Sequence, residues 1–484
     1  MIKNTGIVIA PDSGRVIIRP YIPGNQSRVP GIVSRIMALD ESAAEEELKK
    51  TVRDFSARHH NFDSILERQF EVICAYMPPD FAPSKTRRLL IGAYFIGERS
   101  YESTGLFNPS IVAHPDQSGV SEGSLRFIIS LRATGEGQIS TLVFRSGLID
   151  KYGTVSIDKT SGLACTAEPK PSALYDKMCF IGKLYEMGLE NNCSKYITDP
   201  LPEKFTMEQL EEKVRDYTAG HHPITQTDKL TCEKILWLAR CNYEATFDPK
   251  FPLSERVLFP LSPSEQNGME DARFVYFKND DGSGKYYATY TAYDGRVILP
   301  QIMETEDFIR FKMITLNGRA AVNKGMALFR RKINGRYAMV SRNDNENLFL
   351  MYSDNIHFWH EAVPLMSPLY PWEFVQIGNC GSPIETDRGW LLLTHGVGPM
   401  RQYSISAALL DREDPSRVIG RLSEPLIHWE DNSRSGYVPN VVYSCGAMVH
   451  SDTLIIPYAL NDQQTTIGLV SLRAILDRLT RERI

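Results

Sequence analysis

Residues 285–295 read KYYATYTAYDG, a strand-like run of aromatic and β-branched residues that ends in an Asp-Gly turn signal. Four other runs have the same texture: SLRFIISLR (124–132), RYAMVSR (336–342), GWLLLTHG (389–396) and TLIIPYALND (453–462). From the first-quoted run onward they recur roughly every 50–60 residues, close to the period of propeller blades. Each run ends at, or is followed by, a polar residue. The pattern predicts a mainly β chain, a five-bladed β-propeller with these runs as inner strands; a β-sandwich with helical additions is the alternative.

Two stretches have the three-and-four spacing of apolar residues that indicates helices. One extends from Ser42 to Tyr76, and the other forms most of residues 171–242. The sequence therefore predicts an N-terminal strand with a helical extension (1–90), a first blade region (91–170), a helical insertion (171–242) and the remaining blades (243–484). Because each helical block is short, we expect the two to pack together on one edge of the propeller, as a lid or an oligomer contact.

The bulk composition is that of an ordinary globular protein. Of the 484 residues 42% are hydrophobic, and the formal net charge is -5, which disfavours a nucleic-acid binder driven by phosphate contacts. The 8 cysteines form no CxxC pair, which indicates reduced thiols. The N-terminus lacks the apolar core of a secretory signal, and no segment approaches the ~18 apolar residues of a membrane span. We expect a cytoplasmic protein without membrane or nucleic-acid partners, and a homo-oligomer is conceivable.

Adjacent carboxylates occur in the segment QNGMEDARFVYF (266–277), between an Asn-Gly turn signal and a short apolar strand. Glu270 and Asp271 are the pair, and Arg273 follows on the same face as Asp271 by the strand period of two. A solvated turn is one interpretation. The other is a catalytic acid that the neighbouring arginine holds in place.

Basic and polar residues flank other predicted strands. Lys324 and Arg342 could converge on an anion, the first as a point charge and the second as a bidentate fork. His395, Tyr403 and Asp462 belong to the same predicted ring of strand ends. Neither HExxH nor another metal-ligand spacing accompanies His395, so no metal site is predicted.

Two weaker signals lie earlier in the chain. In GLFNPSIVAH (105–114), Asn108 and Ser110 either belong to a connecting turn or point hydrogen-bonding groups at a sugar. Arg132 ends a predicted inner strand and precedes the Gly-Glu-Gly of LRATGEGQIST, where glycine permits close backbone approach. A hairpin turn explains that segment equally well.

Taken in order, these and further segments resemble glycoside hydrolase family 130, the mannoside phosphorylases and related β-mannosidases. The resemblance covers about residues 100–475 and rests on the segments FNPSIV, NGMEDARFV, ATYTAYDG, NKGMALF, KINGRYAMVSR, YSDNIHFW, WEFVQIG, GWLLLTHGV, SISAALLDREDPSRVIGR, PNVVYSCGA and PYALND. It implies a five-bladed propeller with a central site. It also implies inverting phosphorolysis of a β-mannoside, with inorganic phosphate as co-substrate, no other cofactor, and α-mannose 1-phosphate as product.

The resemblance also implies roles for single residues. Asp271 matches the catalytic acid, which protonates the leaving oxygen through a sugar hydroxyl, and we expect a raised pKa there from burial or from Glu270. The phosphate-binding group is Lys324, Arg342, His395 and Tyr403. The expected substrate contacts are Asn108, Ser110, Arg132, Glu270, Arg273, Tyr293, Asp294 and Asp462.

The chain departs from the family pattern in three places. Ala272 replaces the proline of EDPR, Gln376 stands where many phosphorylases carry lysine, and SRND (341–344) replaces an HRP motif. One basic phosphate ligand is therefore in doubt, and Glu346 or Glu373 could activate water instead. A β-mannosidase and a non-catalytic glycan-binding propeller remain alternatives, and the linkage, β-1,2 or β-1,4, is not readable.

Overall fold

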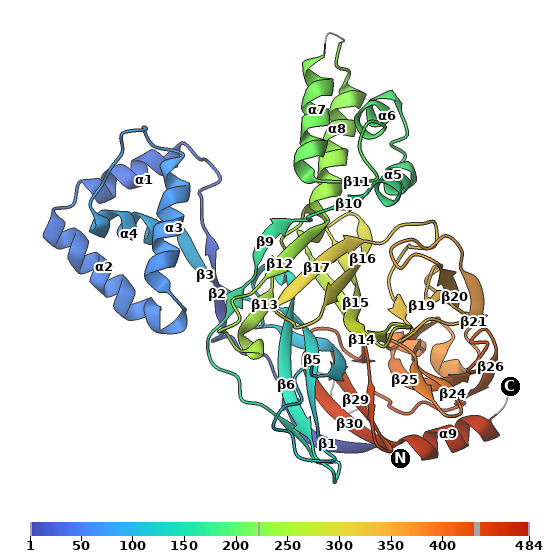
Figure 1. The fold of residues 1–484 in the computed structure, drawn as a ribbon. Helices are drawn as coiled ribbons and strands as arrows, with labels where there is room; N and C mark the ends of the chain where they lie inside the picture. Colours follow the sequence, from blue (N-terminus) through green and yellow to red (C-terminus); the bar gives the residue numbers. More distant parts are fainter. Residues whose placement is uncertain (1, 221–222, 430–435, 483–484) are drawn as a thin grey trace.

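The strand body of the protein is a series of antiparallel sheets in which neighbouring strands mostly follow one another along the chain (Figure 1). The computed structural model describes residues 2–220, 223–429 and 436–482. The structure confirms the kinds of element that the sequence predicts: the chain is mainly β, with two helical blocks.

One 12-stranded sheet contains two meanders joined where Gly268 pairs with Ser140. Its first meander comprises β4 (Gly105–Ala113), β5 (Leu125–Thr134), β6 (Ser140–Ile149) and β7 (Val155–Ile157), with β13 (Arg256–Leu258) and β8 (Cys165–Thr166) beside them. Its second comprises β14 (Gly268–Lys278), β15 (Gly284–Tyr293), β16 (Ile298–Thr305), β17 (Arg310–Thr315), β12 (Tyr243–Thr246) and β9 (Glu168–Pro171).

Three smaller sheets complete the body. The first contains β18 (Ala327–Leu328), β19 (Tyr337–Ser341), β20 (Leu348–Ser353) and β21 (Val363–Met366). The second contains β22 (Gln376–Asn379), β23 (Ile384–Thr386), β24 (Gly389–Val397), β25 (Tyr403–Leu410) and β26 (Val418–Arg421). The third contains β27 (Val442–Tyr443), β28 (Met448–His450), β29 (Thr453–Leu460), β30 (Gln464–Ser471) and β1 (Lys3–Ile9).

The five runs singled out in the sequence are strands, and their predicted place as the inner strands of a propeller stays a prediction. They form β5, β15, β19, β24 and β29, and each is the second strand of its meander. The first strands are β4, β14, β18, β22 and β27, and β4 contacts both β14 and β27. Asn108 and Asp271 lie on such first strands.

The N-terminal strand completes the last sheet. β1 pairs antiparallel with β30, with Lys3 opposite Leu469 and Ile9 opposite Thr465. Helix α9 (Leu472–Arg481) then follows β30 directly and buries Ile475 and Leu479. Chain segments more than 450 residues apart are thus hydrogen-bonded neighbours, which ties both ends to the strand body (Figure 1).

The two helical blocks do not pack together, contrary to the prediction from the sequence. The first comprises α1 (Arg28–Met37), α2 (Glu41–Phe55), α3 (Phe62–Cys74) and α4 (Lys85–Tyr94), and joins the body through β2 (Val16–Pro20) and β3 (Ile96–Ser100). The second comprises α5 (Lys177–Glu186), α6 (Asn192–Thr198), α7 (Met207–Ala219) and α8 (Gln226–Arg240), with β10 (Tyr175–Asp176) and β11 (Lys204–Phe205) at its base. Each block buries an apolar core of its own, and the ribbon shows them standing apart.

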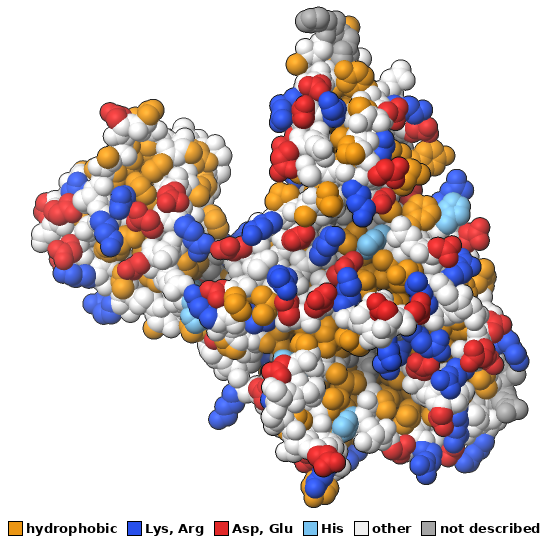
Figure 2. Space-filling model, viewed as in Figure 1, with side chains coloured by type: hydrophobic (Ala, Val, Ile, Leu, Met, Phe, Trp, Pro, Cys, Tyr) orange, Lys and Arg blue, Asp and Glu red, His pale blue; other side chains and the backbone are white. Residues whose placement is uncertain are grey.

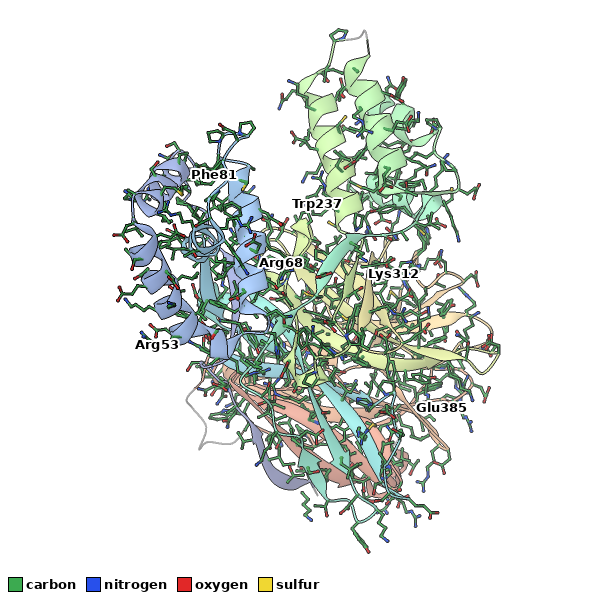
Figure 3. The ribbon with its side chains drawn as sticks, turned by 60° about the vertical axis from the view of Figure 1, so that its left-hand side comes forward. Arg53, Arg68, Phe81, Trp237, Lys312 and Glu385 are labelled. Carbon is green, nitrogen blue, oxygen red and sulfur yellow. The ribbon has the colours of Figure 1, made fainter. Side chains whose placement is uncertain are left out.

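Local signals explain where these helices begin. Asp40 caps α2 by accepting from the backbone N–H of Ala43, and Thr206 with Gln209 forms a capping box on α7. Trp237, near the end of α8, packs against the core of the insertion and the core of the strand body, so it anchors the insertion at its root (Figure 3).

The outer surface is mixed in charge. Lysine, arginine, aspartate and glutamate side chains lie intermingled over both helical blocks (Figure 2). No helix in the described part of the chain is long and apolar enough to cross a membrane.

Candidate functional site

The paired carboxylates lie at the start of β14, where the strand is irregular. The pairing register with β15 shifts between Glu270 and Arg273, and Asp271 adopts φ 56°. A left-handed backbone is uncommon for a residue other than glycine and is found preferentially at functional sites. The irregularity presents the side chain of Asp271 to the ends of neighbouring strands.

Asp271 is surrounded by groups that favour its charged form. The Asn108 amide donates to Oδ1, Arg132 Nη1 lies 3.7 Å from Oδ1, and Arg273 Nη2 lies 3.9 Å from Oδ2. Burial acts to raise the pKa of Asp271, but Arg273, Arg132, Lys324 and the Asn108 donor together lower it below its ordinary value. The raised pKa that we expected from the sequence is therefore wrong for the unliganded site, because positive neighbours outweigh burial.

Glu270 joins two of the predicted site residues. Its Oε1 accepts from Arg132 Nη2 at 2.7 Å, and its Oε2 accepts from Lys324 Nζ at 2.5 Å. The carboxylate is only 10% exposed, whereas Lys324 is 33% exposed. Glu270 thus fixes both cations beside Asp271 and takes up part of their charge.

Arg273 is almost completely buried and holds three separate segments together. It donates to the backbone oxygen of Asp271 at 2.8 Å, to Asn379 Oδ1 at 3.2 Å and to Tyr443 Oη at 2.8 Å. Asn379 in turn donates to the carbonyl of Gly325, next to Lys324. The sequence interpretation missed Asn379 and Tyr443, because no local spacing marks them, although Tyr443 lies in the quoted segment PNVVYSCGA.

His395 lies close to Arg273 and Arg342. Its Nε2 is 3.4 Å from Arg342 Nη1, and its ring stacks on Tyr403 with centroids 5.9 Å apart. Tyr443 meets the same ring edge-on at 4.8 Å. Burial, Arg342 and Arg273 hold the pKa of His395 well below its ordinary value, so the imidazole is neutral at neutral pH. The structure therefore brings together Arg342, His395 and Tyr403, three of the four predicted phosphate ligands. Lys324 is connected to them only indirectly, because Asn379 donates to the carbonyl of the neighbouring Gly325 and accepts from Arg273.

Asp462 is the second unusual carboxyl of the site. It follows β29 in a left-handed conformation, φ 52°, and its carboxyl has no hydrogen-bond partner within the described ranges. Burial, with the negative charges of Asp271 and Glu270, raises its pKa from 3.8 to about 7, against the influence of Arg132. One carboxylate of this cluster is thus ionised at neutral pH while a second is half protonated.

Other predicted contacts do not join the cluster. Ser110 is 1% exposed and its Oγ accepts from the Phe274 backbone N–H at 3.0 Å, so it fastens β4 to β14 and is not open to a substrate. Asp294 accepts from the N–H groups of its own turn, and the Tyr293 hydroxyl donates to the carbonyl of Gly295. These local bonds complete turns, and no contact links them to Asp271.

The two candidate bases for water are differently placed. Glu373 is fully buried, accepts from Arg421 at 2.5 Å, and also accepts from the N–H groups of Leu369 and Tyr370. It completes a structural network and cannot receive a water at the site. Glu346 is exposed in a turn.

The cluster suits an anion better than a metal ion. Within the described residues no group of three or more histidine, cysteine, aspartate or glutamate side chains could hold a metal. Arginine, lysine and histidine instead dominate the surroundings of Asp271. Such donors recognise phosphate or carboxylate groups.

A family profile described as beta-1,4-mannooligosaccharide phosphorylase, that of glycoside hydrolase family 130, matches residues 237–481. A 1,2-beta-oligomannan phosphorylase of Thermoanaerobacter sp. (strain X514) is 33% identical over 234 residues, which are 46% of this chain and 75% of the relative. A beta-1,2-mannobiose phosphorylase of the same strain is 36% identical over 266 residues, 52% of this chain and 84% of the relative.

A solved structure of the beta-1,2-mannobiose phosphorylase of Listeria innocua, in complex with beta-1,2-mannobiose, covers 78% of this chain and 93% of its own. Its sequence identity is 20% and its TM-score 0.46, so the likeness carries no argument here. The matched family range begins at residue 237 and leaves the N-terminal helical block and most of the insertion outside it.

Proposed function

The chain belongs to glycoside hydrolase family 130, and on that basis we propose that it is an inverting phosphorylase. It cleaves β-mannosides with inorganic phosphate and releases α-mannose 1-phosphate. Phosphate is the co-substrate, and the proposed reaction needs no other cofactor.

The observation that carries the proposal is the state of Arg342. It forms no ion pair with any residue in the described part of the chain, yet it lies 3.4 Å from His395 and is partly exposed. An unpaired guanidinium beside a neutral histidine is ready for an anion. Lys324 adds a second, partly exposed cation next to Asp271. Because Gln376 stands where many phosphorylases carry lysine, the proposed phosphate site has one cation fewer than is usual in the family.

In the proposed reaction a phosphate oxygen forms a bond to the anomeric carbon while the bond to the leaving oxygen breaks. The leaving oxygen takes a proton that Asp271 supplies through a sugar hydroxyl. Asp271 is ionised in the unliganded site, so it must first gain a proton. Lys324, one of the predicted phosphate ligands, is among the cations that lower the pKa of Asp271, so phosphate bound beside Lys324 opposes this effect and raises that pKa. We therefore expect the basic limb of the pH–rate profile to lie at higher pH when phosphate saturates the enzyme than when it is scarce; a limb that ignores phosphate contradicts this coupling.

The runner-up is a hydrolase, which needs a second carboxylate about 6.5–9.5 Å from the acid to activate water. Glu373 is unavailable because it is buried against Arg421. Asp462 is a carboxyl of the cluster whose pKa is raised to about 7, so it is the carboxyl that a hydrolytic mechanism would use as its base. The unpaired Arg342 and the partly exposed Lys324 beside Asp271 favour phosphate over water as the nucleophile.

The sheet order supports a five-bladed β-propeller. The two meanders of the large sheet and the three smaller sheets would supply one blade each, with their first strands around the site. We propose the division of the chain predicted from the sequence, with helical segments 1–90 and 171–242 added to the blades of 91–170 and 243–484. A cytoplasmic location, a homo-oligomer and the absence of nucleic-acid and membrane partners belong to the same proposal.

The deciding experiment offers β-1,2- and β-1,4-linked mannooligosaccharides to the purified protein, with and without phosphate. Mannose 1-phosphate that forms only with phosphate supports the proposal, and the preferred linkage follows from the same assay. Free mannose at equal rates without phosphate would refute it. Asp271→Asn should abolish turnover, whereas Asp116→Asn, in an exposed turn, is the matched control.

A further inference from the structure

The helical insertion contacts the strand body close to the segment that bears Lys324. Residues 316–326 connect β17 to β18, and Lys324 lies near the end of this connection. At its beginning, the backbone N–H of Gly318 donates to Glu186 Oε1 at 2.5 Å. Glu186 is the last residue of α5, so the insertion binds the connection directly.

Glu186 is held in position from its own side. Its Oε2 accepts from Lys183 Nζ at 2.6 Å, and the Lys183 side chain is only 7% exposed. The two residues are three apart and therefore lie on one face of α5. One carboxylate oxygen of Glu186 is thus fixed by Lys183 of the same helix, and the other accepts the hydrogen bond from the Gly318 N–H.

Gly318 has little freedom to find another partner. It adopts φ +100°, and a Cβ at this position would lie 2.0 Å from the backbone oxygen of Trp359. The N–H of Ala320 donates to that same oxygen at 3.0 Å. The turn is therefore pressed against the strand body on one side and held by Glu186 on the other.

The second half of the connection is fastened by a different residue. Asn343 donates through Nδ2 to the carbonyl of Ala320 at 2.9 Å, and its own carbonyl accepts from the Asn323 side chain. Asn323 immediately precedes Lys324. Hydrogen bonds thus fasten the connection at both ends, at Gly318 and at Asn323, the residue before the predicted phosphate ligand.

We propose that the helical insertion positions the phosphate-binding connection through Glu186, which acts as a positioning residue for Lys324. This inference rests on the proposed phosphorylase activity. It gives the insertion, which lies largely outside the matched family range, a role in the affinity for phosphate. Of the expected sugar contacts, Asn108 on β4 and Arg273 on β14 form no hydrogen bond with this connection in the described part of the chain, whereas Glu270 on β14 pairs with Lys324.

The test compares steady-state constants for phosphate and for the mannoside in Glu186→Ala and the wild type. Loss of a charge-assisted hydrogen bond, and with it the fixed start of the connection, should raise KM for phosphate about tenfold. KM for the mannoside should stay within about twofold. Glu186→Gln keeps an oxygen acceptor for Gly318 and should restore most of the phosphate affinity. Glu190→Ala, which removes an exposed ion pair with Lys195 in the same block, is the matched control.

Hydrogen exchange supplies a readout that is independent of turnover. In Glu186→Ala, amides of residues 316–326 should exchange faster, while those of β24 remain unchanged. If Glu186→Ala does not fold, Glu186→Asp takes its place, because the shorter side chain draws the carboxylate away from Gly318.

Equal KM values for phosphate in variant and wild type, or a parallel rise of both KM values, would overturn the inference. If the wild type itself shows no phosphate-dependent cleavage, the proposed function fails instead. The exchange experiment still reports whether Glu186 orders the connection, so the two failures can be told apart.

Discussion

Replacing Asp462 by asparagine should stabilise the folded protein above neutral pH. Burial, assisted by Asp271 and Glu270, raises the pKa of this carboxyl from 3.8 to about 7. A raised carboxyl pKa means that the folded state holds the proton more tightly than the unfolded state does. Its stabilising contribution is fully present below pH 3.8, decreases as pH rises, and is lost once pH passes about 7.

The magnitude follows from the size of the pKa difference. About three pKa units correspond to about 4 kcal/mol of unfolding free energy, because each unit is worth about 1.4 kcal/mol. Water still reaches the partly exposed carboxyl of Asp462 and screens part of this cost, so we expect about 2 kcal/mol. Asparagine has the same shape and no charge, and the variant should gain this amount at pH 8.

Urea unfolding of the wild type and Asp462→Asn between pH 4 and pH 8 measures the effect. Trp359 and Trp390 are fully buried in the strand body, so tryptophan fluorescence reports its unfolding. The advantage of the variant should grow between pH 4 and pH 7 and then stay constant. Asp387→Asn, in the exposed turn between β23 and β24, is the control. A difference that does not vary with pH would refute the reasoning.

Three further changes test other parts of the site and the fold. Gly378→Ala places a Cβ 2.3 Å from the His395 ring, so kcat/KM should fall at least about tenfold while the fold survives, as circular dichroism can verify. Asn108→Ala removes a hydrogen bond to the charged form of Asp271; the pKa of that acid should rise, and the basic limb of the pH–kcat/KM profile should move to higher pH. Glu102→Gln leaves two buried arginines without their counter-charge and should lower the unfolding free energy by about 3–5 kcal/mol, measured by urea titration.

The sequence located the strands better than their order within each sheet. The five regular runs are strong strand signals because each is rich in aliphatic, aromatic and β-branched residues. The first strands give no comparable signal. β18 has two residues, β22 has four and contains glycine, and β4 is interrupted by Asn-Pro. Strands that build a site are therefore hard to find from sequence patterns when their backbone is short or irregular near that site.

The error about the helical blocks has a different origin. Each block seemed too short to bury much on its own, which led to the expectation that the two would pack together. Four helices nevertheless suffice to enclose residues such as Val33 and Leu90 in one block, and Leu210 and Ile235 in the other. Helix lengths can be read from a sequence, but the way in which four helices close around a core depends on crossing angles that it does not display.

Within the site, residue types were predictable and protonation states were not. The Glu-Asp pair, the flanking cations and the histidine are visible as local departures from strand patterning. The pKa values depend on distances between segments far apart in the chain, such as Asn108 to Asp271, which are separated by 163 residues. No spacing rule supplies those distances.

The raised pKa that the sequence predicts for Asp271 is found at Asp462 instead. Asp271, the residue that must donate a proton in the proposed reaction, lies among cations and is ionised before ligands arrive. Asp462 lacks hydrogen-bond partners in the described structure and retains a proton to about pH 7. An acid that is charged at rest is consistent with catalysis only if a ligand changes its surroundings, and an anion on the unpaired Arg342 is the change that the site permits. Arg273, Arg132 and Lys324 keep Asp271 ionised in the free enzyme, so an anion that also takes up the charge of Lys324 would make the activation of Asp271 depend on phosphate.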